Sequence, residues 1–248
     1  MYFDQSEYKV RFEWGLAGIE ALAPVTDVFI IVDVLSFTTS VDIVIGNGGI
    51  VYPYNGPGDE LEAFAKERDA LFAKPGRKQV EGYSLSPSSL VTMPEGTRFV
   101  LPSPNGSRLS LATGDVPTLA GCLRNPAWLT ARANQMGERI SVIAAGERWK
   151  DGSLRPSLED LIGAGAMIFH LEGGELSPEA KMAMAAFENA LGRLPETLSQ
   201  CGSGKELIAR GFEEDVRLAS KFNASVVAPE LRNGAYIQIG VVRGRDEQ

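Results

Sequence analysis

Residues 28–35, VFIIVDVL, form an apolar run that a single charged side chain, Asp33, interrupts. A run without polar alternation is typical of a strand covered on both faces, and such strands occur mainly in parallel sheets. Hydroxyl-bearing residues follow at 36–40, apolar residues continue to 45, and the Gly-rich segment 46–49 ends the pattern. A second short strand is predicted at 50–54. This order of strand, helix and strand predicts a right-handed parallel crossover.

The same order of strand, loop and helix recurs three more times along the chain. Strands are predicted at 98–101, 116–121 and 140–145, with helices after the connecting loops, the second at 127–136 and the third from Ser157. Such repeated units indicate an α/β fold, a layered sandwich with a largely parallel or mixed central sheet flanked by helices. No linker rich in Pro, Gly or Ser divides the sequence, so we expect one α/β domain over residues 1–248.

The other segments carry weaker patterns. Residues 60–72 have helical spacing, residues 79–83 predict a weak strand, and a short helical turn begins at Ser86 and Pro87. Residues 178–194 and 204–222 are predicted to be mainly helical, and 226–228 and 236–242 to be closing strands.

Charge and composition exclude several classes of function. The 248 residues carry 24 Lys and Arg against 32 Asp and Glu, a net charge of −8, which offers no general attraction to nucleic acid or an anionic membrane. One His rules out a metal site with several His ligands from one chain, and two Cys are too few for a disulfide framework. The chain lacks an apolar stretch of about 18 residues, so we expect a soluble, cytoplasmic protein without a membrane span. The sequence does not determine the oligomeric state and is compatible with a homo-oligomer.

Polar residues gather in the loops that follow four predicted strands. They are Asp33 with Thr38 and Thr39, Asn105 to Arg108, Arg124 with Asn125, and the segment from Glu147 to Asp160. Ligands of open α/β sheets bind beyond the carboxyl ends of the strands, so a parallel sheet would place all four loops at one edge. Arg108 and Arg124 lie beside helix starts with free amides, which suits a phosphate or sulfonate.

Asp33 is the sharpest single position in the sequence. A carboxylate within a buried strand is costly unless it is paired, hydrogen-bonded or bound to a cation. Further carboxylates occur at Glu147, Asp151, Glu159 and Asp160. Oxygen ligands without a His or Cys cluster favour Mg²⁺ over zinc.

Each loop also has a purely structural interpretation. Asn105-Gly106 is a common turn dipeptide, and Asn125 before Pro126 is typical of a helix start. Ser157 and Asp160 resemble a capping box. His170 ends an apolar run, and we interpret it as a structural residue.

Several motifs, taken in order, resemble those of the 2-phosphosulfolactate phosphatase family. They are Asp33-Val34-Leu35 with Thr38-Thr39, SPNGSR at 103–108, CLRN at 122–125, AAGERW at 144–149, DGSLRP at 151–156, EDL at 159–161, GAG at 163–165, SGKELI at 203–208, Gly211-Phe212 and Asp215-Val216. The matches extend from about residue 27 to residue 230. One departure is that Ser36 and Phe37 stand where the family commonly has Arg-Ala.

The resemblance implies a Mg²⁺-dependent phosphatase with an α/β fold, a phosphoric monoester hydrolase. The family reaction removes phosphate from 2-phospho-3-sulfolactate on the route to coenzyme M. From these residues and this resemblance we expect Asp33, Glu147 and Asp151 to be catalytic and Asp33, Glu147 and Asp160 to bind Mg²⁺. The residues expected to bind a small phosphorylated anionic substrate are Thr38, Thr39, Asn105, Gly106, Ser107, Arg108, Arg124 and Asn125.

Three alternatives remain open on the sequence alone. One is a phosphatase for another small phosphoester, because Ser36 replaces the arginine that the family commonly has at this position. The second is a noncatalytic protein that binds phosphorylated metabolites through the same loops. The third is a structural or interaction protein, for which the polar loops would not cluster.

Overall fold

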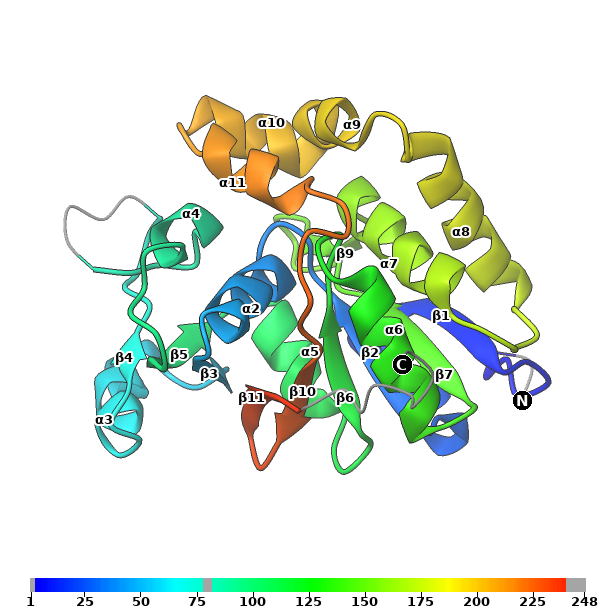
Figure 1. The fold of residues 1–248 in the computed structure, drawn as a ribbon, viewed down its shortest axis with the longest axis horizontal. Helices are drawn as coiled ribbons and strands as arrows, with labels where there is room; N and C mark the ends of the chain where they lie inside the picture. The colour runs from blue at the N-terminus through cyan, green and yellow to red at the C-terminus, as the bar shows by residue number, and fades with distance from the viewer. Residues whose placement is uncertain (1–2, 78–81, 240–248) are drawn as a thin grey trace, which may run out of the picture.

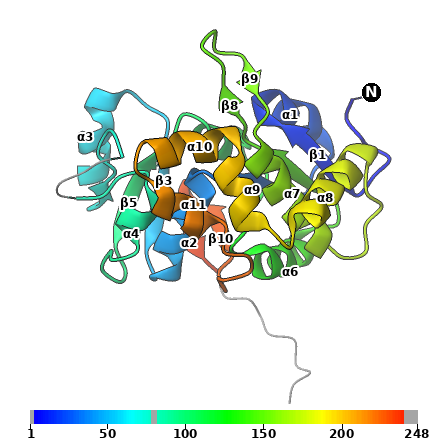
Figure 2. The same ribbon diagram turned by 90° about the horizontal axis from the view of Figure 1, so that it is seen from above.

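The computed structural model describes residues 3–77 and 82–239. In this part of the chain nine strands form one mixed sheet in the order β1-β7-β2-β6-β10-β11-β3-β5-β4, and a separate hairpin of β8 and β9 projects from the body (Figure 2). The strands are β1 (Val10–Trp14), β2 (Val28–Val32), β3 (Ile50–Tyr54), β4 (Leu71–Phe72), β5 (Arg98–Pro102), β6 (Thr118–Gly121), β7 (Ile140–Ala144), β8 (Glu147–Arg148), β9 (Leu154–Arg155), β10 (Pro229–Arg232) and β11 (Ala235–Gln238). The predicted α/β fold with a mixed sheet flanked by helices is confirmed.

Helices cover both faces of the sheet (Figure 1). They are α1 (Gly15–Leu22), α2 (Phe37–Gly46), α3 (Leu61–Lys66), α4 (Pro87–Leu90), α5 (Gly106–Ala112), α6 (Pro126–Met136), α7 (Leu158–His170), α8 (Pro178–Ala190), α9 (Leu194–Gln200), α10 (Gly202–Ala209) and α11 (Glu213–Ala219). None of the helices within the described residues is long and apolar enough to cross a membrane.

β2 is the strand that the apolar run predicts, and all of its residues are buried. Its side chains alternate between the two faces of the sheet. Val28, Ile30 and Val32 pack with α6, α7 and α8, whereas Phe29 and Ile31 pack with α1 and α5. Because both faces are covered, every position of the strand is apolar.

A hairpin near the C-terminus divides the sheet into two parallel blocks. β1, β7, β2 and β6 pair in parallel, as do β3, β5 and β4. β10 and β11 lie between the blocks and pair antiparallel with β6, with each other and with β3. These successive reversals leave the two blocks running in opposite directions. The polar loops therefore do not share the single carboxyl edge that a parallel sheet would provide.

α5 follows β5 and packs across both blocks. It contacts β3 of its own block and also α1 and β2 of the first block. Leu109 of α5 packs with Phe29 and Ile31 of β2, and the hydroxyl of Tyr236 donates to Ser110 Oγ at 2.7 Å. This packing brings the N-terminus of α5 to the carboxyl end of β2. The strand direction alone would not do so, because β5 runs opposite to β2.

Helices α9, α10 and α11 lie at the top of the view in Figure 1, and we call them the α9–α11 segment. Arg155 belongs to β9, in the hairpin that follows β7, and its Nη2 donates to Ser203 Oγ of α10 at 3.1 Å. Arg124 Nη1, after β6, donates to the carbonyl of Leu218 in α11 at 3.3 Å. The segment is therefore tied to loops at the carboxyl ends of two strands of the first block.

The structure differs from the sequence predictions at several places. β1 and α1 were not predicted. Residues 60–72, predicted as one helix, divide into α3 and β4, because Asp69 at φ 49° takes up a left-handed conformation that a helix cannot continue through. Residues 226–228 are not a strand, since β10 begins at Pro229. The strand predicted at 79–83 lies mostly outside the described residues.

We expect Gly165→Ala to destabilise the protein. A Cβ at Gly165 of α7 would lie 2.0 Å from the carbonyl oxygen of Ala183 in α8, so the two helices would have to separate. The free energy of unfolding in urea should fall by roughly 1–3 kcal/mol. Gly46→Ala is the control, because nothing lies within 4 Å of a Cβ there and stability should be unchanged or higher. Wild-type stability for Gly165→Ala would contradict the close contact of α7 and α8.

Candidate active site

Asp33 lies directly after β2 and accepts hydrogen bonds from two separate parts of the backbone. Oδ1 accepts from the N–H of Phe37 at 3.2 Å, and Oδ2 accepts from the N–H of Gly106 at 3.0 Å. The residue is 7% exposed. Amides at the start of a helix have no partner within that helix. The carboxylate therefore joins the first turns of α2 and α5.

Two threonines hold the loop that carries Asp33. Thr38 Oγ1 donates to the carbonyl of Asp33 at 2.8 Å and accepts from its backbone N–H at 3.1 Å. Thr39 Oγ1 donates to the carbonyl of Val34 at 2.8 Å. Both threonines are fully buried. The sequence predicts them to bind substrate, but in the structure their hydroxyls bind the backbone and position Asp33.

Gly106 can approach Asp33 because it has no side chain. A Cβ at this position would lie 2.2 Å from Cδ1 of Phe37. A larger residue would push the α5 amide away from the carboxylate. The neighbouring Ser107 is also predicted to bind substrate, but its Oγ is buried and donates to the carbonyl of Leu101 at 2.6 Å.

Asp160, in the first turn of α7, ties together the loops after β2 and β7. Oδ1 accepts from the N–H of Val34 at 2.8 Å, and Oδ2 accepts from the N–H of Gly146 at 2.9 Å. Val34 is next to Asp33, and Gly146 is next to Glu147. Asp160 therefore fixes the spacing of two other carboxylate-bearing loops.

Negative charge gathers at this end of β2. Burial raises the pKa of Asp33 to about 6, with a contribution from Glu147, while the N–H groups of Phe37 and Gly106 and the charge of Arg77 act against the rise. Burial also raises the pKa of Asp160 well above its usual range, and the charges of Glu159 and Asp33 add to it. A bound cation would relieve this repulsion.

Glu159 is buried beside Asp160. Among the described residues its Oε2 has no hydrogen-bond partner. Its charge acts on the thiol of Cys201, whose pKa is raised to about 12 mainly by burial. Cys201 Sγ accepts from the N–H of Gly204 and donates to the carbonyl of Leu198, so the thiol caps α10 and is not a nucleophile at neutral pH.

A cavity of about 310 Å³ is lined by Asn105, Arg108 and Glu147, together with residues of α1. Asn105 Nδ2 donates to Glu147 Oε1 at 3.1 Å. Asn105 is also the residue before Gly106, whose amide binds Asp33. The structure thus brings together three side chains that the sequence predicts for one site, and places them next to the loop that binds Asp33.

Arg124 and Asn125 are engaged elsewhere. Arg124 Nε donates to Asp42 Oδ2 at 2.7 Å, and both residues line a separate cavity. Asn125 is fully buried, where its Oδ1 accepts from the N–H of Cys122 and its Nδ2 donates to the carbonyl of Ala120. The structure does not bring these two predicted substrate-binding side chains to Asp33.

Asp151 lies between β8 and β9, in the hairpin that projects from the body in Figure 2. It is exposed, and its Oδ1 accepts hydrogen bonds from the N–H and the hydroxyl of Ser153. These bonds lower its pKa. In this position Asp151 shapes the turn and does not join Asp33.

Arg77 acts electrostatically on Asp33, and the sequence analysis did not single it out. Its Nη1 donates to Asp215 Oδ2 at 3.1 Å. Arg77 lies outside every described helix and strand, so no periodic pattern distinguishes it. The one available signal was Asp215, which belongs to a motif of the family.

The carboxylates at this site are hard oxygen donors, the type of ligand that Mg²⁺ takes in proteins. Among residues 3–77 and 82–239, no three His, Cys, Asp or Glu side chains are grouped to hold a metal ion. Proteins usually bind Mg²⁺ through one or two carboxylates, with water and substrate oxygens as the other ligands. Asp33, with either Glu147 or Asp160, supplies that number of carboxylates.

The structure shows an α/β fold in which buried carboxylates lie next to a cavity lined by Asn105, Arg108 and Glu147. The chain belongs to the 2-phosphosulfolactate phosphatase family, because the family model described as 2-phosphosulpholactate phosphatase matches residues 19–234. This confirms the resemblance and, with it, the class of phosphoric monoester hydrolases.

Curated relatives support the assignment at low identity, and each is named a probable 2-phosphosulfolactate phosphatase. The protein of Gloeobacter violaceus is 29% identical over 199 residues, which cover 77% of this chain and 82% of the relative. That of Thermotoga petrophila is 26% identical over 216 residues, covering 84% and 90%. That of Carboxydothermus hydrogenoformans is 28% identical over 206 residues, covering 81% and 84%.

Proposed function

We propose that this protein is a Mg²⁺-dependent phosphatase of a small phosphorylated hydroxy acid, foremost 2-phosphosulfolactate, which it hydrolyses to sulfolactate and phosphate. The observation that carries the proposal is the hydrogen bond of Gly106 N–H to Asp33 Oδ2 at 3.0 Å. It joins the loop that bears Asn105 and Arg108 to a buried carboxylate. An anion-binding loop next to a carboxylate is what phosphoryl transfer requires.

In this proposal Arg108 and Asn105 bind the phosphoryl oxygens from the cavity that they line. The guanidinium fork matches the spacing of phosphate oxygens, and its hydrogen bonds strengthen as charge develops on them. Asp33 and either Glu147 or Asp160 would hold Mg²⁺, which would polarise the phosphoryl group and offset its negative charge. The carboxylate that is not a ligand activates the attacking water.

The chain prepares these groups before substrate binds. Thr38 holds the backbone of Asp33, and Asp160 binds the amides next to Asp33 and Glu147. Catalytic groups that are already fixed need little reorganisation in the transition state. This is the role we assign to the buried hydrogen bonds around Asp33.

Phosphate release from four esters tests the proposal. The purified protein is assayed with 2-phosphosulfolactate, 2-phospholactate, phosphoglycolate and 3-phosphoglycerate, each with Mg²⁺ and after chelation by EDTA. We expect the highest kcat/KM for 2-phosphosulfolactate and a loss of about 100-fold or more on chelation, reversed by added Mg²⁺.

The other outcomes decide between the alternatives. Full turnover after chelation by EDTA would contradict the proposed requirement for Mg²⁺. A higher kcat/KM for another ester would identify that ester, and not 2-phosphosulfolactate, as the preferred substrate. Binding of the esters without phosphate release would identify a protein that only binds phosphorylated metabolites.

A further inference from the structure

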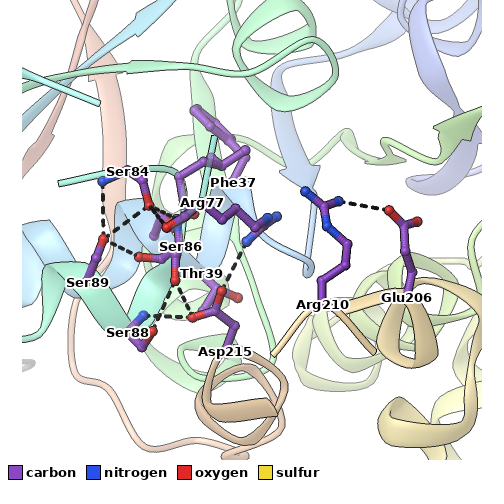
Figure 3. Close-up of polar contacts among 12 residues, drawn as sticks. Phe37, Thr39, Arg77, Ser84, Ser86, Ser88, Ser89, Glu206, Arg210 and Asp215 are labelled. Carbon is purple, nitrogen blue, oxygen red and sulfur yellow. Dashed lines mark hydrogen bonds and ion pairs between the residues drawn. The ribbon is translucent and has the colours of Figure 1, made fainter. Parts of the chain in front are cut away.

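Two arginines from distant parts of the chain face each other near Asp33. Figure 3 shows the guanidinium groups of Arg77 and Arg210 pointing toward one another. Each guanidinium carbon lies 5.9 Å from the centre of the Phe212 ring. Their like charges repel, since the charge of Arg210 lowers the pKa of Arg77, which burial lowers most. An anion between them would remove the repulsion and accept hydrogen bonds from both.

Arg77 is held in place by a buried carboxylate. Its side chain is 13% exposed and that of Asp215 is fully buried. Asp215 also accepts from Ser86 Oγ at 2.6 Å and from the N–H of Ser88 at 3.0 Å, as Figure 3 shows. Among the described residues, Asp215 is the one hydrogen-bond acceptor recorded for the Arg77 guanidinium. A guanidinium has five N–H donors, so Arg77 can bind Asp215 and an anionic ligand at the same time.

The surroundings of Arg77 connect it to the phosphatase site. The charge of Arg77 acts on Asp33 at one side and meets that of Arg210 at the other. Ser36, three residues after Asp33, has a buried hydroxyl with no hydrogen-bond partner among the described residues. The loop of Asp33 therefore contributes a buried hydroxyl without a partner among the described residues, and Arg77 contributes a guanidinium whose charge acts on Asp33.

Arg210 is free to change partners. Its side chain is 52% exposed, and its partner Glu206, one turn earlier in α10, is 62% exposed. Such an exposed pair contributes at most about 1 kcal/mol of stability. Arg210 can therefore turn from Glu206 to a ligand at little cost, whereas Arg77 stays fixed by Asp215.

We propose that Arg77 and Arg210 bind a second anionic group of the substrate, a sulfonate or a carboxylate, while the phosphoryl group is bound beside Asp33. This inference rests on the proposed function. Arg77 and Arg210 are then specificity-determining residues, and Asp215 is a positioning residue that acts through Arg77. The site selects phosphomonoesters with an additional negative charge.

The test compares three esters in the wild type and in Arg210→Gln. They are 2-phosphosulfolactate, which has a sulfonate and a carboxylate; 2-phospholactate, which has only the carboxylate; and glycerol 2-phosphate, which has neither. Loss of a hydrogen bond between charged groups should raise KM by about 10-fold or more. We expect this rise for the esters with a second anion, and a change of less than about 2-fold for glycerol 2-phosphate. A rise with 2-phosphosulfolactate alone identifies the sulfonate, and a rise with both identifies the carboxylate.

Arg217→Gln is the matched control. Arg217 lies on α11 and forms an exposed pair with Glu214 one turn earlier, as Arg210 does with Glu206. Arg217→Gln should leave all KM values unchanged.

Arg77→Lys is a second test variant. It keeps the charge but loses the planar fork, so it should shift KM in the same selective way, and its melting temperature shows whether it is folded. Because Arg210 is exposed, Arg210→Gln should stay folded. It therefore tests whether the second anionic group is bound here even if Arg77→Lys unfolds.

Calorimetry with sulfolactate separates this inference from the proposed function. If the wild type hydrolyses none of the esters, the proposed function fails, and binding of sulfolactate that Arg210→Gln weakens about 10-fold would still support the anion site. Equal KM changes for all three esters, or no change in KM and no change in sulfolactate binding, would overturn the inference.

Discussion

Replacing Asp33 with Asn is expected to lower kcat by at least about 10³-fold, within the range that proton-transferring and metal-binding carboxylates contribute. Asp33 is buried, and its two oxygens join the first turns of α2 and α5. The neutral amide cannot supply the negative charge to a cation. Steady-state kinetics with the best substrate of the four esters measures the effect.

The same change should affect stability much less than activity. The amide avoids the cost of burying a charge, but its NH₂ group would face the N–H of either Phe37 or Gly106. These effects oppose each other, so we expect the free energy of unfolding to change by no more than about 1–2 kcal/mol. Asp115→Asn, in an exposed loop, is the control and should keep wild-type kcat. Normal turnover by Asp33→Asn would remove Asp33 from the mechanism.

Arg124→Ala should cost about 3–5 kcal/mol of unfolding free energy, because it leaves the buried Asp42 carboxylate without its cation. The side chain of Arg124 is 14% exposed and that of Asp42 is fully buried. We expect the folded variant to keep its kcat, since Arg124 binds Asp42 instead of lying beside Asp33. A 10²-fold loss of kcat in the folded variant would instead support the substrate contact that the sequence predicts.

Chemical denaturation at several pH values adds a second readout. Burial already raises the pKa of Asp42, and a hydrogen bond with Ser225, followed by the charge and hydrogen bond of Arg124, acts against the rise. Without Arg124 the pKa of Asp42 in the folded state rises further. Between the pKa of Asp42 in the unfolded state and its higher pKa in the folded state, the folded protein therefore keeps a proton on Asp42 that the unfolded protein has lost. The stability difference from wild type should therefore be largest near pH 8 and shrink toward pH 5. Arg217→Ala, which breaks an exposed pair, should cost at most about 1 kcal/mol.

The sequence predicts best where one strand or loop carries the whole signal. β2 lies where the continuous apolar run predicts it, because burial on both faces removes polar alternation. Asp33 stands out because it is the single charged side chain in that apolar run. The edge strand β1 was missed, since its segment, VRFEW, includes two charged residues.

Residue type alone did not separate substrate-binding side chains from those that hold a loop. Thr38, Thr39 and Ser107 have hydroxyls that could bind an anion, yet each donates to a backbone carbonyl. A short hydroxyl side chain near a turn can bind its own backbone as readily as a ligand. Only the positions of the carbonyl groups decide between the two.

By itself, the sequence determined the α/β class, the buried strand that leads to Asp33, and membership of the phosphatase family through its ordered motifs. The tertiary structure decided which of these polar residues meet. The β10–β11 hairpin reverses the direction of the block of β3, β5 and β4, and the packing of α5 against both β2 and β3 places Gly106 beside Asp33. Arg124 pairs with Asp42, 82 residues away, and Arg77 pairs with Asp215, 138 residues away. Local periodicity records which faces of a helix or strand are buried, but it contains no information about the partner that a buried charge will find across the fold.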